Sequence, residues 1–186
     1  MDRPAGEALA GGLNPKWQQA VQPPVPPYLD TAASGTIGLS SHSCLMKFLA
    51  VILTGLALIA PAAHAYEFLN KIGLAQTDYS VVQQIYNGWW IAGLLLPLAC
   101  LANGVNAVWL RHDRTAMKLS IAAAGLIVLN LVIFMLFTQP ANAATQNWTV
   151  QMENWEALRA QWEYSHLVNA AVNFLAFCCA TLASTR

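Results

Sequence analysis

Four long apolar stretches, separated by short polar connections, divide the chain. They cover residues 46–65, 89–110, 119–138 and 165–184. Each is close to the ~20 residues that an α-helix needs to cross a hydrocarbon core of ~30 Å. The pattern predicts an all-α, polytopic membrane protein, in which residues 46–186 form one domain, a bundle of four transmembrane helices.

Two prolines and a polar flank are expected to shape these helices. Pro97 leaves the carbonyl of Gly93 without its usual donor, which predicts a bend in the second helix. Pro140 is expected to end the third helix and to begin an outer loop. Helical periodicity before residue 165 predicts a long fourth helix that runs from Asn154 to Ser184, ~46 Å at 1.5 Å per residue.

The first 45 residues differ from the rest in composition. They contain the run PPVPP, several Gly and Ser residues and few side chains able to form a core, which predicts a disordered tail. Met46 is an alternative start of the biological chain. Residues 46–65 also have the basic start, apolar centre and Ala-His-Ala end of a cleavable signal peptide. We expect them to be retained as the first helix, with cleavage as the alternative.

The charged residues limit the partners that the sequence predicts and indicate how the protein is oriented in the membrane. Charged residues make up 10% of the chain and the net charge is zero, so no nucleic-acid partner is expected. Arg111, Arg114 and Lys118 concentrate in the connection between the second and third stretches. Since basic loops stay on the cytoplasmic side, both termini and this loop should be cytoplasmic, and the other two connections external.

A stripe of polar and aromatic residues follows one face of the fourth helix. At ~100° per residue, its members lie within about 120° of Glu163. A bilayer penalises unpaired polar groups, so the stripe should face protein, water or a ligand. Besides Glu163 it comprises Trp155, Arg159, Trp162, His166, Asn169 and Asn173.

Polar residues of the first two stretches fall at the same membrane depth as this stripe. Counting ~20 residues along each helix brings His64 and Glu67, with Lys71 just beyond, to the outer boundary. Gln84, Asn87 and Trp90 flank the start of the second stretch on that side. Asn103 and Asn106, nearer the inner end, are exceptions. The depths predict a polar pocket at the outer end of the bundle.

The residue types predict metal-free acid–base chemistry in this pocket. A histidine beside a carboxylate can act as a general base, while Arg159 or Lys71 can hold the anionic oxygen of a phenolate or enolate. The expected catalytic residues are His166, Glu163, Arg159, His64 and Glu67. The expected ligand-binding residues are Lys71, Gln84, Asn87, Trp90, Trp155, Trp162, Asn169 and Asn173.

Two other interpretations of the same residues stay open. His64-x-x-Glu67 and Glu163-x-x-His166 place a histidine and a carboxylate on one helix face, as in helical-bundle metal sites, so these four residues are a less favoured Zn or Fe site. No other cofactor is expected. Alternatively, the polar groups hold the bundle together through interhelical hydrogen bonds and an Arg159–Glu163 ion pair. The heptad spacing of Trp148, Trp155 and Trp162 favours a packed seam over a ligand-stacking platform.

Four segments resemble the bacterial branch of the anthrone-oxygenase-like family of small four-helix membrane proteins. They are YEFLNKIGL (66–74), VQQIYNGWW (82–90), PANAATQNW (140–148) and WEALRAQWEYSHLVNA (155–170), and the resemblance covers residues 46–184. It implies retention of the first helix, a place in the bacterial inner membrane and oxidation of an anthrone-like aromatic. No catalytic residue is carried over from the fungal enzymes of this family.

Two functional hypotheses follow. The first is an oxygenase-like oxidoreductase that acts on a lipophilic aromatic or quinone-like molecule without a cofactor. The second is a non-catalytic membrane subunit or binding module whose polar stripe packs against a membrane-protein partner.

Overall fold

A computed structural model describes residues 33–186, with side chains from His42 onward, and this part of the chain is helical with no strand. Residues 40–186 form the unit described below. The elements are α2 (Ala33–Lys71), α3 (Gln76–Gln83), the 3-10 helix η1 (Gln84–Tyr86), α4 (Trp90–Gly93), α5 (Leu95–Trp109), α6 (Arg114–Ile133), the π-helix η2 (Phe134–Thr138), α7 (Gln139–Ala144) and α8 (Trp155–Ser184).

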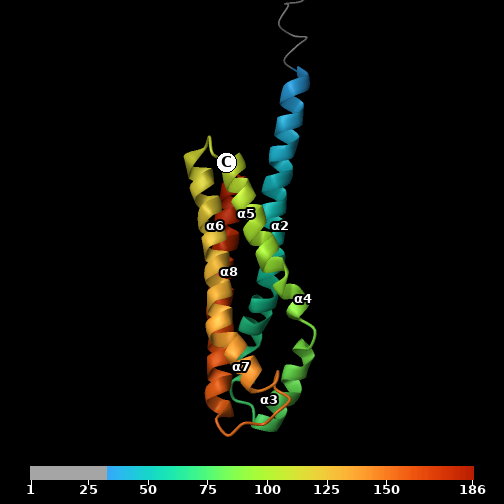
Figure 1. Cartoon of the computed structure of the whole chain (residues 1–186), viewed down its shortest axis with the longest axis vertical. Coiled ribbons are helices and arrows are strands. Elements are labelled where there is room, and N and C mark those ends of the chain that lie inside the picture. Colours follow the sequence, from blue (N-terminus) through green and yellow to red (C-terminus); the bar gives the residue numbers. More distant parts are fainter. Residues whose placement is uncertain (1–32) are drawn as a thin grey trace, which may run out of the picture. The chain divides into compact units, whose positions relative to one another are not determined.

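Four helical spans in the described part are long and apolar enough to cross a membrane. They are His42–Lys71, Trp90–Trp109, Arg114–Ala144 and Trp155–Ser184. In residues 40–186, α6 lies beside both α5 and α8, and the α5–α6 loop and the C-terminus share one end of the bundle (Figure 1). Helices α3 and α7 lie at the other end (Figure 1). The all-α, four-span architecture is therefore confirmed.

The first helix begins earlier than predicted. Helix α2 starts at Ala33, so residues 33–45, expected to be disordered, are helical. The reason is that no proline follows until Pro61, and nothing stops the helix from extending back from its apolar part. The rest of the predicted tail, residues 1–32, lies outside the described residues. Residues 46–65 are entirely helical.

Pro97 breaks the second span where predicted. Helix α4 ends at Gly93 and α5 begins at Leu95, and the N–H of the intervening Leu94 donates to the carbonyl of Ile91 at 3.1 Å. The proline nitrogen cannot donate to Gly93, so the regular α-helical hydrogen bonding is interrupted one turn before it.

Pro140 does not end the third span, which corrects the predicted loop. Helix α6 continues through the π-helix η2 into α7, and Pro140 lies in the first turn of α7, where a missing N–H is tolerated. The helix therefore carries Gln139 and Asn142 onward at the end of the bundle that also holds α3. The chain leaves it after Ala144 through three residues with positive φ: Gln146 (47°), Asn147 (56°) and Trp148 (64°).

The middle of the bundle is apolar and closely packed. Ala57, Ala99, Ile127 and Ala176, from four different helices, form its buried cluster. On the side of the α5–α6 loop, Asn103 donates to Thr54 Oγ1 at 2.8 Å, and Asn106 donates to Ser120 Oγ at 3.2 Å. The two asparagines that fall outside the predicted pocket thus tie α5 to α2 and to α6.

Candidate functional site

A cavity of about 610 Å³ lies at the end of the bundle that carries α3 and α7. Ten of its lining side chains are carboxamides, and none of the lining residues, all within the described part, is Asp, Glu, Lys or Arg. The amide side chains are Gln83, Gln84, Asn87, Asn130, Gln139, Asn142, Gln146, Asn147, Asn169 and Asn173. The rings are His64, Tyr86, Trp89, Trp90, Phe134, Trp148, Trp162 and His166.

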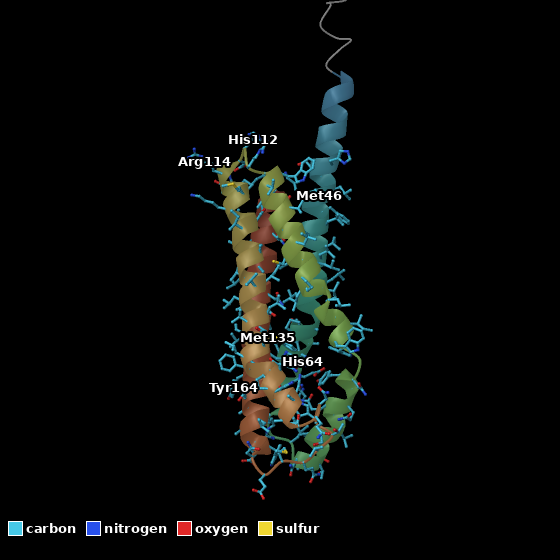
Figure 2. The ribbon with its side chains drawn as sticks, in the orientation of Figure 1. Met46, His64, His112, Arg114, Met135 and Tyr164 are labelled. Atoms are coloured by element: carbon cyan, nitrogen blue, oxygen red, sulfur yellow. The ribbon has the colours of Figure 1, made fainter. Side chains whose placement is uncertain are left out.

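Two histidines from different helices meet at this cavity. The rings of His64 (α2) and His166 (α8) are 4.2 Å apart, and His64 also contacts Tyr86 at 4.4 Å. Figure 2 shows His64 among the side chains inside the bundle, near the level of α7. The common depth predicted for the polar residues of the first and fourth helices thus brings His64 and His166 together. His64 is buried, and its Nδ1 has no hydrogen-bond partner among the described residues.

Asparagines with unused hydrogen-bonding atoms also line the cavity. Asn173 is fully buried, and neither its amide nitrogen nor its oxygen has a partner within the described chain. Asn169 likewise leaves its side-chain oxygen unpaired, although its backbone carbonyl accepts from Asn130 Nδ2 at 3.1 Å. Since an unmet buried donor or acceptor costs about 1–3 kcal/mol, these atoms are poised for a polar partner in the cavity.

Tryptophans form another wall. The Nε1–H of Trp162 donates to Asn142 Oδ1 at 2.8 Å, and its ring lies 4.1 Å from that of His166. Trp148 packs against Trp162 at 6.3 Å while its backbone stays in the left-handed region. A bulky residue in that conformation costs of order 1–3 kcal/mol and persists only where its surroundings hold it. Trp155 also joins this aromatic cluster, so the predicted seam exists, and two of its three rings line the cavity.

The carboxylates lie in a separate ionic cluster, outside the cavity lining. Lys71 Nζ is 3.3 Å from Glu163 Oε1 and 3.4 Å from Glu67 Oε2, and it sits 4.9 Å from the centre of the Trp162 ring. Trp162 thus borders both the cavity and this cluster. Glu163 and Lys71 are buried, whereas 41% of the Glu67 side chain is exposed.

Two tyrosines complete the ionic cluster. Tyr79 donates to Glu163 Oε1 at 2.9 Å, and Tyr86 donates to Glu67 and accepts from Lys71 Nζ. Burial first, and then the neighbouring carboxylate, raise the pKa of both phenols above the usual value. Both hydroxyls therefore stay protonated as donors. Glu163 is thus paired with polar groups of α2 and α3.

Arg159 and Trp155 are placed away from the cavity. Arg159 Nη1 donates to the carbonyl of Leu74 at 2.7 Å, and its guanidinium stacks 4.3 Å from the Trp155 ring. Glu163 forms its ion pair with Lys71. The Arg159–Glu163 ion pair that was expected if the polar groups only hold the bundle together is not the one formed. Both side chains also face the Tyr79 ring of α3, at 5.7 Å for Arg159 and 6.3 Å for Trp155, and so link the start of α8 to α3.

The predicted site residues therefore fall into two groups. Lining the cavity are His64, His166, Gln84, Asn87, Trp90, Trp162, Asn169 and Asn173. Outside its lining are Glu67, Lys71, Trp155, Arg159 and Glu163. Sequence reasoning missed Asn142 and Gln139, because the third helix was expected to end at Pro140. It also missed Tyr79, because its helix α3 has only eight residues and is too polar to stand out as an apolar stretch.

The four residues of the metal alternative do not converge. The two histidines adjoin each other, but Glu67 and Glu163 face Lys71. Among the described residues, no group of three or more His, Cys, Asp or Glu side chains has the arrangement of a metal site. These four residues therefore lack the common centre that a Zn or Fe site requires.

The fold and the cavity define a multi-pass helical membrane protein with a pocket that is lined by aromatic rings and carboxamides and by no Asp, Glu, Lys or Arg. Comparison of the chain with protein-family models, with curated protein sequences and with solved structures found no match. Because a helical bundle can carry many unrelated functions, the chemistry of the cavity is the better guide to this one.

Proposed function

We propose that the cavity binds a neutral, lipophilic aromatic or quinone-like molecule with hydroxyl or carbonyl groups, and that the protein is an oxygenase-like enzyme acting on it. One observation carries the proposal: buried, unpaired polar atoms of His64, Asn169 and Asn173 meet in a cavity without charged residues. A charged ligand would find no counter-charge there, whereas a neutral oxygen function satisfies both amide and imidazole.

Size and shape support this ligand class. A cavity of about 610 Å³ lies within the ~300–1,000 Å³ range typical of small-molecule sites. Flat tryptophan and histidine rings line it, and aromatic rings stack at separations of about 4.5–7 Å. A planar aromatic body fits between these rings, while its oxygens reach Asn169 and Asn173.

The histidine pair supplies the base. For an anthrone-like substrate, a ring-flanked CH₂ loses a proton to His166, and the carbanion that remains is stabilised as an enolate by the neighbouring amide donors. Dioxygen is the oxidant: one of its atoms becomes the new carbonyl oxygen and the other leaves as water, so CH₂ and O₂ give C=O and H₂O. No organic cofactor enters this sequence.

Turnover under labelled oxygen tests this proposal. Purified protein in detergent should convert anthrone to anthraquinone faster than the spontaneous reaction, consuming one O₂ per product. Under ¹⁸O₂, mass spectrometry should find one ¹⁸O atom in each anthraquinone. Heat-inactivated protein is the control. A rate equal to that control across a panel of anthrones and hydroquinones would favour a non-catalytic binding module.

We further propose that the protein spans the bacterial inner membrane with both termini cytoplasmic and the cavity at the outer boundary. The excess of basic residues around the α5–α6 loop supports this orientation. Reporter fusions after Arg114 and Arg186 should then read cytoplasmic, and fusions after Asp78 and Ala144 external. The opposite pattern would reverse the topology.

Retention of the first helix is tested by N-terminal sequencing of the membrane-extracted protein. Helix α2 supplies His64 to the cavity, so a functional site requires that it stays. A mature N-terminus at Tyr66 would show that the preceding residues are cleaved as a signal peptide. It would remove His64 and most of helix α2 from the protein.

A further inference from the structure

We infer that a second pocket, at the opposite end of the bundle, is a binding site for one anionic phospholipid. The pocket measures about 410 Å³ and is lined by Gly104, Ala107, Val108 and Arg111 from α5 and the loop after it, and by Met117, Ile121 and Ala124 from α6. It shares no residue with the candidate active site.

Its lining forms a groove on the outer face of two neighbouring helices. On α5 the residues recur at intervals of three and four, as do those on α6, so each set occupies one helix face. Val108 and Ile121 are more than half exposed, which in a membrane means exposure to lipid. From Gly104 to Arg111 the groove runs roughly 10 Å at 1.5 Å per residue, long enough for the upper part of an acyl chain.

Glycine at position 104 keeps the groove open. A Cβ built on Gly104 meets no heavy atom within 4 Å, so packing inside the described chain does not require glycine there. Any larger side chain at this position would enter the space that the groove leaves for a ligand.

The polar end of the groove selects a negative headgroup. Arg111 is the one charged residue in the lining, and Arg114 and Lys118 lie nearby on α6. Figure 2 shows His112 in the α5–α6 loop and Arg114 at the start of α6, at the opposite end of the unit from His64. Lys47 and the C-terminal Arg186 meet at the same end, through a 2.9 Å hydrogen bond from Lys47 Nζ to the Arg186 carbonyl.

The single acidic group of the loop is already engaged. Asp113 caps α6 by accepting from the N–H groups of Thr115 at 2.9 Å and Ala116 at 3.0 Å. The loop thus presents guanidinium and ammonium groups beside an apolar groove, the combination by which basic pockets between transmembrane helices hold anionic lipids. A zwitterionic lipid would fill the groove without this attraction.

Native mass spectrometry of the full chain, delipidated and then titrated with phosphatidylglycerol or phosphatidylcholine of matched acyl chains, tests the inference. One phosphatidylglycerol should bind at lower concentration than phosphatidylcholine. Arg111→Gln should weaken that binding roughly fivefold, the factor for one basic residue beside an anionic headgroup. Arg114→Gln removes the same charge from outside the lining and should have the smaller effect. Gly104→Leu should displace the lipid while keeping every charge.

Three outcomes would overturn the site. Equal binding of the two lipids would show that the groove binds acyl chains without selecting an anionic headgroup. Equal losses in Arg111→Gln and Arg114→Gln would indicate a diffuse basic surface. A wild-type dimer that Gly104→Leu dissociates would assign the groove to a second copy of this chain. Because Arg111→Gln lies at the exposed loop, it tests the inference even if Gly104→Leu fails to fold.

Discussion

Replacing His166 by alanine is expected to lower the turnover of an anthrone-like substrate by about 10²–10⁴-fold, the usual contribution of a general base. His166 lines the cavity beside His64, with 4.2 Å between ring centres. His64→Ala should cause a similar loss, and the double variant should lose little more, because residues that act as a unit are not additive. The measurement is turnover per folded molecule, with folding followed by thermal melts in detergent.

His112→Ala is the matched control, since His112 lies exposed in the α5–α6 loop. It should leave turnover unchanged. Normal turnover by a well-folded His166→Ala protein would remove this residue from the chemistry. Loss of turnover in proportion to loss of folded protein would instead identify the histidine pair as a packing element.

Replacing Lys71 by methionine is expected to destabilise the protein by about 3–5 kcal/mol, because Glu163 would keep a buried charge without its ion-pair partner. The double variant Lys71→Met/Glu163→Gln should recover most of that loss, since it removes both charges together. Thermal melts of the purified protein measure both effects.

Lys118→Met serves as the control for this substitution. Lys118 is exposed on α6, and the change should alter stability by no more than about 0.5 kcal/mol. Equal melting temperatures for Lys71→Met and Lys118→Met would show that the ionic cluster contributes nothing to folding. A double variant as unstable as Lys71→Met would show that packing, not charge, explains the loss.

Much of the fold follows from hydropathy because lipid imposes one requirement on every span. Each crossing must satisfy its own backbone hydrogen bonds over ~30 Å, so the apolar stretches predict the four helices and their approximate lengths. Pro97 predicts the break at Leu94 by the same argument. Pro140 led to a wrong prediction for the end of the third helix. A proline inside a helix interrupts it, but a proline in the first turn is tolerated, and Pro140 lies in the first turn of α7, directly after the π-helix η2.

The polar stripe predicts the α8 wall of the cavity, including Trp162, His166, Asn169 and Asn173. Helical spacing cannot predict which residues of a polar helix face line the cavity and which join the ionic cluster. Two residues three apart differ by ~60° around the axis, so His64 can border the cavity while Glu67 meets Lys71. Which neighbour each one meets depends on α3 and η1, which are too short for a hydropathy signal. The separation of charge from cavity is therefore a property of the tertiary structure.

Titration with anthraquinone, a planar compound with two carbonyl groups and no reactive CH₂, tests the central claim that the cavity is a binding site for neutral oxygenated aromatics. Trp89, Trp90, Trp148 and Trp162 line the cavity, so binding should quench tryptophan fluorescence to saturation.

Asn173→Leu should weaken binding roughly tenfold or more, because it removes both unpaired amide atoms. It should not lower the melting temperature, since a buried polar group without a partner is replaced by an apolar one of similar volume. Asn70→Leu, at an exposed position outside the cavity, should bind as wild type. Two results would contradict the assignment of the cavity as a binding site. One is quenching of the wild-type protein that does not saturate, and the other is an Asn173→Leu protein that is less stable but binds with unchanged affinity.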